Sequence, residues 1–165
     1  MTLYLDFDRT LFDTRRFYNA LEKDFIFGEK VVSAETLKDF LYEDTILFLK
    51  KQREKGVRLV VVTRGDEKAQ GFKVRHSGVE ELVDAVFYVP EGTKAAAIQK
   101  DLSQGKPPHV FIDDQRVELK AVQEELEAVT PVRMRRETAE NSGEEFPGFL
   151  EVASLLEFET MLETL

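Results

Sequence analysis

The chain has 165 residues, of which 42% are hydrophobic and 33% are charged, and its formal net charge at pH 7 is -9. These values are typical of one folded domain with a single core and exclude a wholly disordered chain. The negative charge disfavours non-specific binding to nucleic acid, which requires a basic surface. The sequence contains no cysteine, which excludes disulfides, thiolate nucleophiles and cysteine-ligated zinc.

The first residues show no basic leader, and Asp6 interrupts the apolar run before it becomes long. No stretch is long and apolar enough to span a bilayer. We therefore expect no signal peptide, no membrane association and residence in the cytoplasm. The sequence leaves the oligomeric state open.

Strands and helices alternate along the chain. Short apolar runs that end in polar residues are typical of buried parallel strands, and they lie at 3–5, 57–62, 85–89 and 110–112. Apolar residues recur at helical spacing in 45–55, 67–78, 94–102 and 117–128. We expect a further strand at 130–134 and a closing helix at 154–165. The alternation predicts one doubly wound, Rossmann-like α/β domain over residues 1–165, with a parallel sheet.

The segment 15–42 lies outside this alternation. Apolar residues recur in it at helical spacing: Phe17, Leu21 and Phe25, then Leu37, Phe40 and Leu41. We expect a small, cap-like helical insertion after the first strand, whose phenylalanines pack rather than line a substrate pocket. Residues 135–148 are polar with Gly and Pro, which predicts a loop.

Polar side chains follow the ends of the predicted strands. In an open parallel sheet, ligands bind beyond the carboxyl ends of the strands, near the point where the winding reverses. The residues at these ends are Asp6-Phe7-Asp8-Arg9-Thr10, Thr63-Arg64-Gly65 and Asp113-Asp114, and Lys94 opens the helix after the third strand. Crowded carboxylates need a neutralising partner, and oxygen ligands without His or Cys suit Mg²⁺.

In this order, the residues resemble the four motifs of the haloacid dehalogenase superfamily. The matching segments are Leu3 to Leu11 with its Asp-x-Asp-x-Thr, Val60 to Thr63, Lys94, and Val110 to Asp114. The resemblance covers essentially the whole chain outside the insertion. It implies a Rossmann-like hydrolase fold and a phosphatase that uses Mg²⁺ on a phosphorylated substrate.

The resemblance also implies a role for each matched residue. Asp6 would be the nucleophile that forms an aspartyl-phosphate, and Asp8 would protonate the leaving oxygen and then deprotonate the attacking water. Thr63 would donate a hydrogen bond to the phosphate, and Lys94 would hold both that phosphate and Asp6. An aspartate at position 8 favours phosphoryl transfer over dehalogenation, because a departing halide needs no proton.

The metal ligands implied by the resemblance are a carboxylate oxygen of Asp6, the backbone carbonyl of Phe7, and Asp113. Two interpretations of Asp114 stay open. It either ligates through water or orients Asp113, or it caps the helix that follows, since an aspartate before a helix accepts its free amide hydrogens.

Two arginines depart from the common form of the motifs. Arg9 stands at a variable position often held by glycine, and Arg64 stands where asparagine is frequent. The fork of an arginine suits phosphate and carboxylate, so both are candidate substrate contacts. The alternative is that each is solvated or paired with an acidic neighbour.

Two other functions share part of the pattern. In a receiver domain the paired acids follow the first strand and the phosphorylated aspartate ends the third, whereas here the third run ends at Val89-Pro90 and the acid pair follows the fourth. A non-catalytic phosphate-binding or regulatory module is the second alternative, although every expected catalytic position is filled. The substrate stays open among sugar phosphates, nucleotides, other metabolites and a nucleic-acid end.

Overall fold

The computed structural model describes residues 1–24, 34–137 and 145–165. At its centre is a six-stranded sheet in the order β3-β2-β1-β4-β5-β6, and each pair of neighbouring strands is parallel. The strands are β1 (Thr2–Leu5), β2 (Arg58–Arg64), β3 (Ala85–Val89), β4 (His109–Asp113), β5 (Val129–Met134) and β6 (Leu150–Val152). The predicted doubly wound parallel α/β fold is confirmed.

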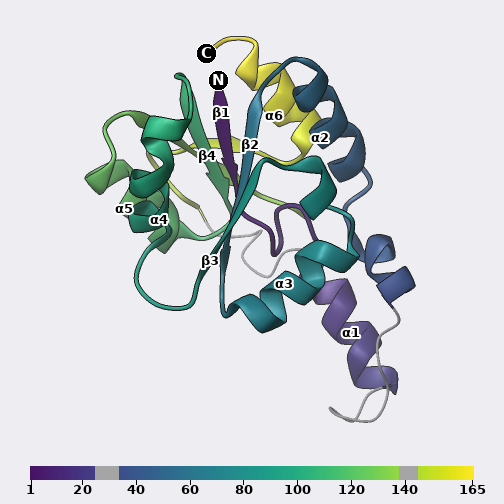
Figure 1. The fold of residues 1–165 in the computed structure, drawn as a ribbon. Coiled ribbons are helices and arrows are strands. Elements are labelled where there is room, and N and C mark those ends of the chain that lie inside the picture. The colour runs from purple at the N-terminus through teal and green to yellow at the C-terminus, as the bar shows by residue number, and fades with distance from the viewer. Residues whose placement is uncertain (25–33, 138–144) are drawn as a thin grey trace.

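Helices cover both faces of the sheet (Figure 1). The α-helices are α1 (Thr14–Asp24), α2 (Thr45–Glu54), α3 (Glu67–His76), α4 (Lys94–Asp101), α5 (Arg116–Glu125) and α6 (Leu155–Leu162), and short 3-10 helices are η1 (Ala34–Phe40), η2 (Glu80–Leu82) and η3 (Leu102–Gln104). Residues of α4 and α5 pack on one face, and residues of α2, α3 and α6 pack on the other. No helix in the ranges described is long and apolar enough to cross a bilayer.

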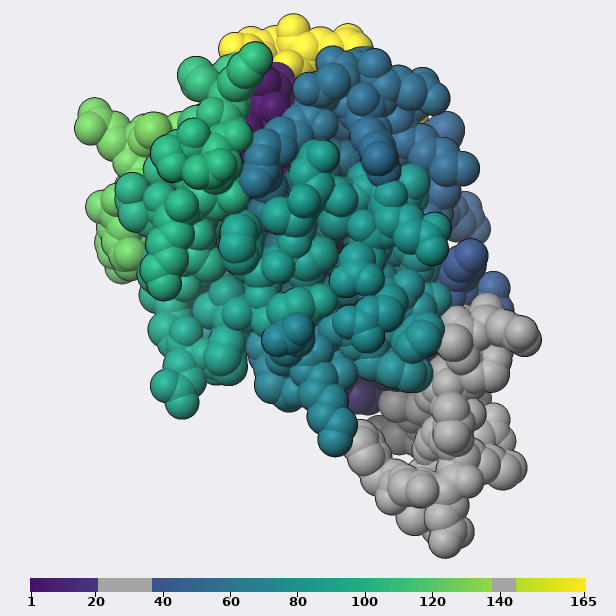
Figure 2. All heavy atoms as spheres, in the orientation of Figure 1, coloured from purple at the N-terminus to yellow at the C-terminus, as the bar shows by residue number. Residues whose placement is uncertain are grey.

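The strand β1 lies in the middle of the sheet and is completely buried. Leu3 and Leu5 pack into the hydrophobic cluster of one face, and Tyr4 packs into that of the other. In the space-filling view the purple atoms of the chain's start reach the surface only at its margins (Figure 2). Burial on both faces explains why the sequence shows a continuous apolar run here rather than an alternating one.

The winding of the sheet reverses at β1. The chain proceeds from β1 through β2 to β3 on one side and then returns to place β4 on the other side of β1. The amide of Asp6 donates to the carbonyl of Ile112 at 3.0 Å, so the ends of β1 and β4 lie side by side. Residues that follow these two strands therefore meet at the switch point, where open α/β sheets bind ligands. A receiver domain has a different strand order, 2-1-3-4-5.

Several boundaries differ from the sequence-based expectation. β2 and β4 extend further than predicted, so Thr63, Arg64 and Asp113 lie in the strands rather than after them. The short strand β6 was not predicted, because only three residues form it and two of them are exposed.

The predicted insertion is described only in part. Its first helix is α1, whereas the helix expected around Leu37 and Phe40 is the 3-10 helix η1. Phe17 is buried and its ring contacts the rings of Phe12 and Phe40, which agrees with a packing role. Residues 25–33, with the predicted Phe25, and residues 138–144 of the predicted loop lie outside the described residues. That the segment 15–42 acts as a cap stays a prediction.

Arg136, which follows β5, holds the loop after β1. Its guanidinium donates to the carbonyl of Thr10 at 2.9 and 3.2 Å and to both carboxylate oxygens of Asp44 at 2.7 and 2.8 Å. The carboxylate of Asp44 also accepts the amide of Leu155, the first residue of α6, at 2.8 Å. One largely buried ion pair therefore joins the β1 loop, α2 and α6.

We expect Arg136→Met to lower the free energy of unfolding by about 2–4 kcal/mol, because it leaves the carboxylate of Asp44 without its cation. Urea denaturation followed by circular dichroism measures the loss. Lys120→Met, which removes only an exposed pair with Glu124, is the matched control and should change stability by less than about 0.5 kcal/mol. An equally small effect at position 136 would show that this ion pair does not secure the loop.

Candidate active site

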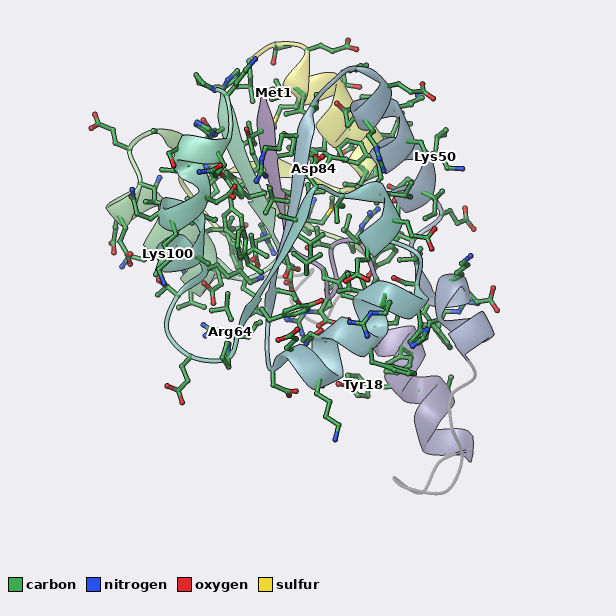
Figure 3. The ribbon with its side chains drawn as sticks, in the orientation of Figure 1. Met1, Tyr18, Lys50, Arg64, Asp84 and Lys100 are labelled. Atoms are coloured by element: carbon green, nitrogen blue, oxygen red, sulfur yellow. The ribbon has the colours of Figure 1, made fainter. Side chains whose placement is uncertain are left out.

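A cavity of about 260 Å³ opens at the carboxyl end of the sheet. Residues from the ends of β1, β2 and β4 and from the start of α4 line it, among them Asp6, Asp8, Arg64, Lys94 and Asp114. Tyr18 and Arg64, which both line the cavity, lie at the opposite end of the sheet from Met1 (Figure 3). The predicted site residues are therefore brought together at the edge where parallel sheets bind ligands.

Three buried carboxylates meet beneath this cavity. One oxygen each of Asp6, Asp113 and Asp114 lies within 4.8 Å of the others. The ammonium of Lys94 donates to Asp6 Oδ1 and, at 2.6 Å, to Asp113 Oδ2. Lys94 thus bridges the ends of β1 and β4, and its contact with Asp113 adds to the predicted contacts with Asp6 and the phosphate.

Burial of these acids shifts their protonation equilibria. Burial raises the pKa of Asp6 and drives the pKa of Asp113 well above its usual range, although Lys94 opposes both shifts. Burial and the charge of Asp6 raise the pKa of Asp114 to about 6 against the opposing charge of Arg9. When all three carboxyls are ionised, their three negative charges exceed the two positive charges of Lys94 and Arg9, which favours binding of a further cation.

The donor set fits Mg²⁺. Every candidate ligand is a carboxylate oxygen, and Asp6 Oδ2 is buried without a hydrogen-bond donor among the residues that the structure describes. Hard divalent cations prefer such oxygens. The carbonyl of Phe7, however, accepts the amides of Leu11 and Phe12, both at 2.9 Å, which occupy its two lone pairs. The geometry does not support the predicted metal contact at Phe7, because this carbonyl closes the turn after β1.

The structure also distinguishes the two interpretations of Asp114. The helix α5 begins at Arg116 with Gln115 at its N-cap, so Asp114 is not the capping residue. Its Oδ2 instead accepts a hydrogen bond from Arg9 Nε at 2.6 Å. Asp113 Oδ1 accepts the amide of Gln115 at 2.7 Å, which fixes the orientation of that carboxylate.

The two unusual arginines each pair with an acid at the cavity. Arg9 has a φ of 65°, the left-handed conformation that glycine adopts without strain and that costs another residue about 1–2 kcal/mol. Its ion pair with Asp114 offsets this cost. Arg64 donates to the carbonyl of Gly92 at 2.5 Å and to the carboxylate of Glu118. Both arginines line the cavity and keep part of their surface exposed.

Thr63 is fully buried in β2 and, like the fully buried Asp113, is not among the residues that line the cavity. Its hydroxyl has no hydrogen-bond partner in the part of the chain that the structure describes. A buried hydroxyl without a partner is costly, so it indicates a ligand contact at this strand end.

Asp8 is held by residues of two helices. Its Oδ1 accepts from Thr14 at 2.7 Å and from Lys73 at 2.5 Å, and its Oδ2 accepts from Gln70 at 3.0 Å and from Lys73 at 2.7 Å. Burial alone would raise the pKa of Asp8, but the ammonium of Lys73 and these hydrogen bonds outweigh it and lower the pKa. The surroundings therefore favour the ionised carboxylate.

Sequence reasoning missed four residues that bond the predicted site residues: Thr14 of α1, Gln70 and Lys73 of α3, and Glu118 of α5. Glu118 is buried and accepts the amide of Lys94 at 2.9 Å as well as the guanidinium of Arg64, so it fixes the start of α4. The sequence gives only a weak signal for Gln70 and Lys73. They stand one helical turn apart, and Lys73 precedes the buried Val74.

Comparisons with known proteins give both sequence and structural relatives. No family model matches the chain. The enolase-phosphatase E1 of Aquifex aeolicus (strain VF5) is 32% identical in an alignment of 133 positions that covers 74% of this chain and 56% of that protein. The chain therefore spans little more than half the length of this relative.

Solved structures share the fold. A haloacid dehalogenase-like protein from Burkholderia xenovorans LB400 superimposes with a TM-score of 0.74 and 15% identity over 99% of this chain and 96% of that chain. The D,D-heptose 1.7-bisphosphate phosphatase of B. bronchiseptica, solved with magnesium and phosphate, gives a TM-score of 0.62 and 14% identity over 100% of both chains. At such low identity these matches establish the fold alone.

The pKa shifts predict how a divalent cation changes stability with pH. A carboxyl whose pKa is raised on folding binds more protons in the folded than in the unfolded chain, so its contribution to stability falls as pH rises from its usual 3.8 to about 6. A bound cation offsets the charge that appears over this window. Mg²⁺ at a hundred times its Kd should thus raise Tm by about 5–10 °C at about pH 7.5 and by less at about pH 5.

Thermal unfolding followed by circular dichroism, with and without Mg²⁺, measures this difference. Asp113→Asn is the control, because it removes a proposed ligand and should reduce the Mg²⁺-dependent shift in Tm. If Mg²⁺ leaves Tm unchanged at both pH values, the carboxylates do not form a cation site.

Proposed function

This chain belongs to the haloacid dehalogenase superfamily, and we propose that it is a magnesium-dependent phosphatase that hydrolyses a small phosphate monoester. The observation that supports this most is the convergence of Asp6, Asp113 and Asp114 around Lys94 at the switch point of the sheet. The curated relative is an enolase-phosphatase and a structural neighbour is a phosphatase solved with magnesium and phosphate, which agree with the proposal.

Asp6 would begin the reaction. Its Oδ1 accepts from Lys94 and its buried Oδ2 has no donor among the described residues, so the carboxylate would use one oxygen for the cation and the other to attack phosphorus. Attack forms an oxygen–phosphorus bond and breaks the bond to the leaving alcohol, and water then hydrolyses the aspartyl-phosphate. Thr63 would donate its hydroxyl to a phosphate oxygen, and the ammonium of Lys94 would attract the same group.

Asp8 would carry the proton. The structure favours its ionised form, which can accept a proton from the attacking water in the second half of the reaction. In the first half, the protonated carboxyl would donate to the leaving alcohol. Asp8 lines the cavity beside Asp6, as this exchange requires.

Asp6 and Asp113 would hold Mg²⁺, with Asp114 either ligating through water or orienting its neighbour. When bound, Mg²⁺ supplies positive charge that offsets the charge of the transferring phosphoryl group. Arg9 and Arg64 are proposed substrate contacts at the cavity, although each is paired with an acid in the structure.

The charge distribution favours a small substrate over a nucleic acid. Overall the chain carries -9, and the cavity is lined by three cations, Arg9, Arg64 and Lys94, beside four carboxyls. Surface charges are screened beyond about 8 Å at physiological salt, so a small phosphate ester is affected mainly by the groups of the cavity and by a bound cation. A long polyanion would also lie against the acidic surface.

We expect the protein to hydrolyse a generic aryl phosphate only with a divalent cation and to lose this activity in excess chelator. Phosphate release measured before and after chelation, and again after Mg²⁺ is restored, tests the requirement. Manganese should substitute in part, since it accepts oxygen ligands. Full activity in excess chelator would exclude a metal role for the carboxylates, and no release with any cation would favour a non-catalytic binding module.

We expect different losses from Asp6→Asn and Asp8→Asn, although the two residues are separated by one position. Asp6→Asn removes the attacking carboxylate, so turnover should vanish on an aryl and an alkyl phosphate alike. Asp8→Asn removes the proton carrier. It should slow release of the leaving group by about 10²–10⁴-fold on the alkyl ester but much less on the aryl ester, whose leaving group needs no proton, whereas hydrolysis of the aspartyl-phosphate should slow equally for both.

Leaving-group release in the first turnover, measured for both variants on both esters, gives these losses, after circular dichroism confirms that each variant is folded. Near-parental activity in Asp6→Asn would overturn the assignment of the nucleophile. An equal loss on both esters in Asp8→Asn would remove the support for its acid role.

A further inference from the structure

Lys73 is a buried lysine that the proposed chemistry does not use. It lies on α3, its side chain is only 10% exposed, and its ammonium contacts both carboxylate oxygens of Asp8. A lysine is rarely buried unless its charge is paired, because desolvation of the ammonium is costly. The pairing with Asp8 therefore accounts for how Lys73 can lie inside the protein, and it makes the two charges dependent on each other.

Aromatic rings hold the ammonium from a second direction. Its nitrogen lies 5.8 Å from the ring centroid of Phe7 and 5.7 Å from that of Phe12, and both rings are fully buried. These distances allow cation–π attraction, which is stronger away from water. The ammonium is thus fixed between the rings and the carboxylate of Asp8.

The ammonium of Lys73 is engaged by both oxygens of Asp8. Asp8 and Thr14 line the cavity, whereas Lys73 is not among the lining residues. We therefore expect the effect of Lys73 on the reaction to pass through Asp8.

The hydrogen bonds of Asp8 show what Lys73 adds. A carboxylate has about four lone-pair sites, and here Thr14, Gln70 and the two contacts of Lys73 account for four. Thr14 and Gln70 are neutral and each bonds one oxygen. Lys73 alone bonds both oxygens, so it fixes the plane of the carboxylate, and its charge offsets a second negative charge close to Asp6.

We propose that Lys73 is a positioning residue that holds the carboxylate of Asp8 in the orientation needed for proton transfer, without itself contacting the substrate. The inference rests on the proposed phosphatase function and extends it to a residue of α3. Small misplacement of a catalytic group is costly, since about 1 Å can reduce a rate about 10²-fold.

The first test is Lys73→Met, which keeps the length and apolar character of the stem but removes the ammonium. On an alkyl phosphate we expect the first-turnover rate of leaving-group release to fall by about 10²-fold, with KM unchanged within about twofold. On an aryl phosphate with a good leaving group, this rate should fall by less than about threefold, because that departure needs no proton. Lys68→Met, an exposed lysine on the same helix, is the matched control and should behave as the parent.

The second test places Lys73→Met in the Asp8→Asn background. If Lys73 acts only through Asp8, the double variant should match Asp8→Asn within about twofold on both esters. The comparison of the double variant with Asp8→Asn also tests the proposal if Lys73→Met alone does not fold. The double variant removes both charges together and leaves neither one buried and unpaired.

Each outcome decides the proposal. Parental activity of Lys73→Met, an equal loss on both esters, or a further loss in the Asp8→Asn background would overturn it and leave the phosphatase assignment intact. Absence of metal-dependent phosphate release from the parent protein would instead overturn the proposed function itself. A loss confined to the alkyl ester, with no further loss when Lys73→Met is added to Asp8→Asn, supports Lys73 as the residue that positions Asp8.

Discussion

The parallel pairing of β1 with β4 is the constraint on which the rest of the site depends. Because the winding reverses there, two strands that are distant in sequence end side by side and bring Asp6 next to Asp113. Lys94 then bridges the two carboxylates from the start of α4. Burying three acids beside one lysine is unfavourable by itself, and their raised pKa values record that cost. The fold keeps this arrangement because the surrounding sheet is held by apolar packing on both faces.

Much of the fold follows from the sequence, since buried parallel strands are short apolar runs and the helices between them carry helical spacing. β3 was predicted at its observed bounds, whereas β2 continues through Thr63 and Arg64 because polar residues can still pair within a sheet. β6 has too few buried side chains to leave a pattern. Leu37 and Phe40 have helical spacing, which does not distinguish an α-helix from the 3-10 helix found there.

The candidate site was predictable where its residues stand at strand ends, and unpredictable where they come from helices. Asp6, Asp113 and Lys94 occupy places that topology brings together. Lys73 is 65 positions from its partner Asp8, and a lysine or glutamine in a helix ordinarily indicates a solvated face. Only the three-dimensional contact shows that this lysine is buried. The Phe7 carbonyl shows the opposite case, because a motif position does not reveal that its lone pairs are used by the turn.

Asp6 and Asp8 illustrate how one short loop separates two carboxylates into different chemical environments. Asp6 shares Lys94 with Asp113, so burial prevails and its pKa rises. Asp8 has Lys73 as a cation and receives further hydrogen bonds from Thr14 and Gln70, so its pKa falls. A bound divalent cation would therefore favour the proposed attack by Asp6, since it would keep that carboxylate ionised. Asp8, in contrast, is kept ionised by Lys73 and needs no divalent cation. The two roles proposed for these aspartates thus depend on which lysine each one meets, and those lysines come from α3 and α4 on opposite faces of the sheet.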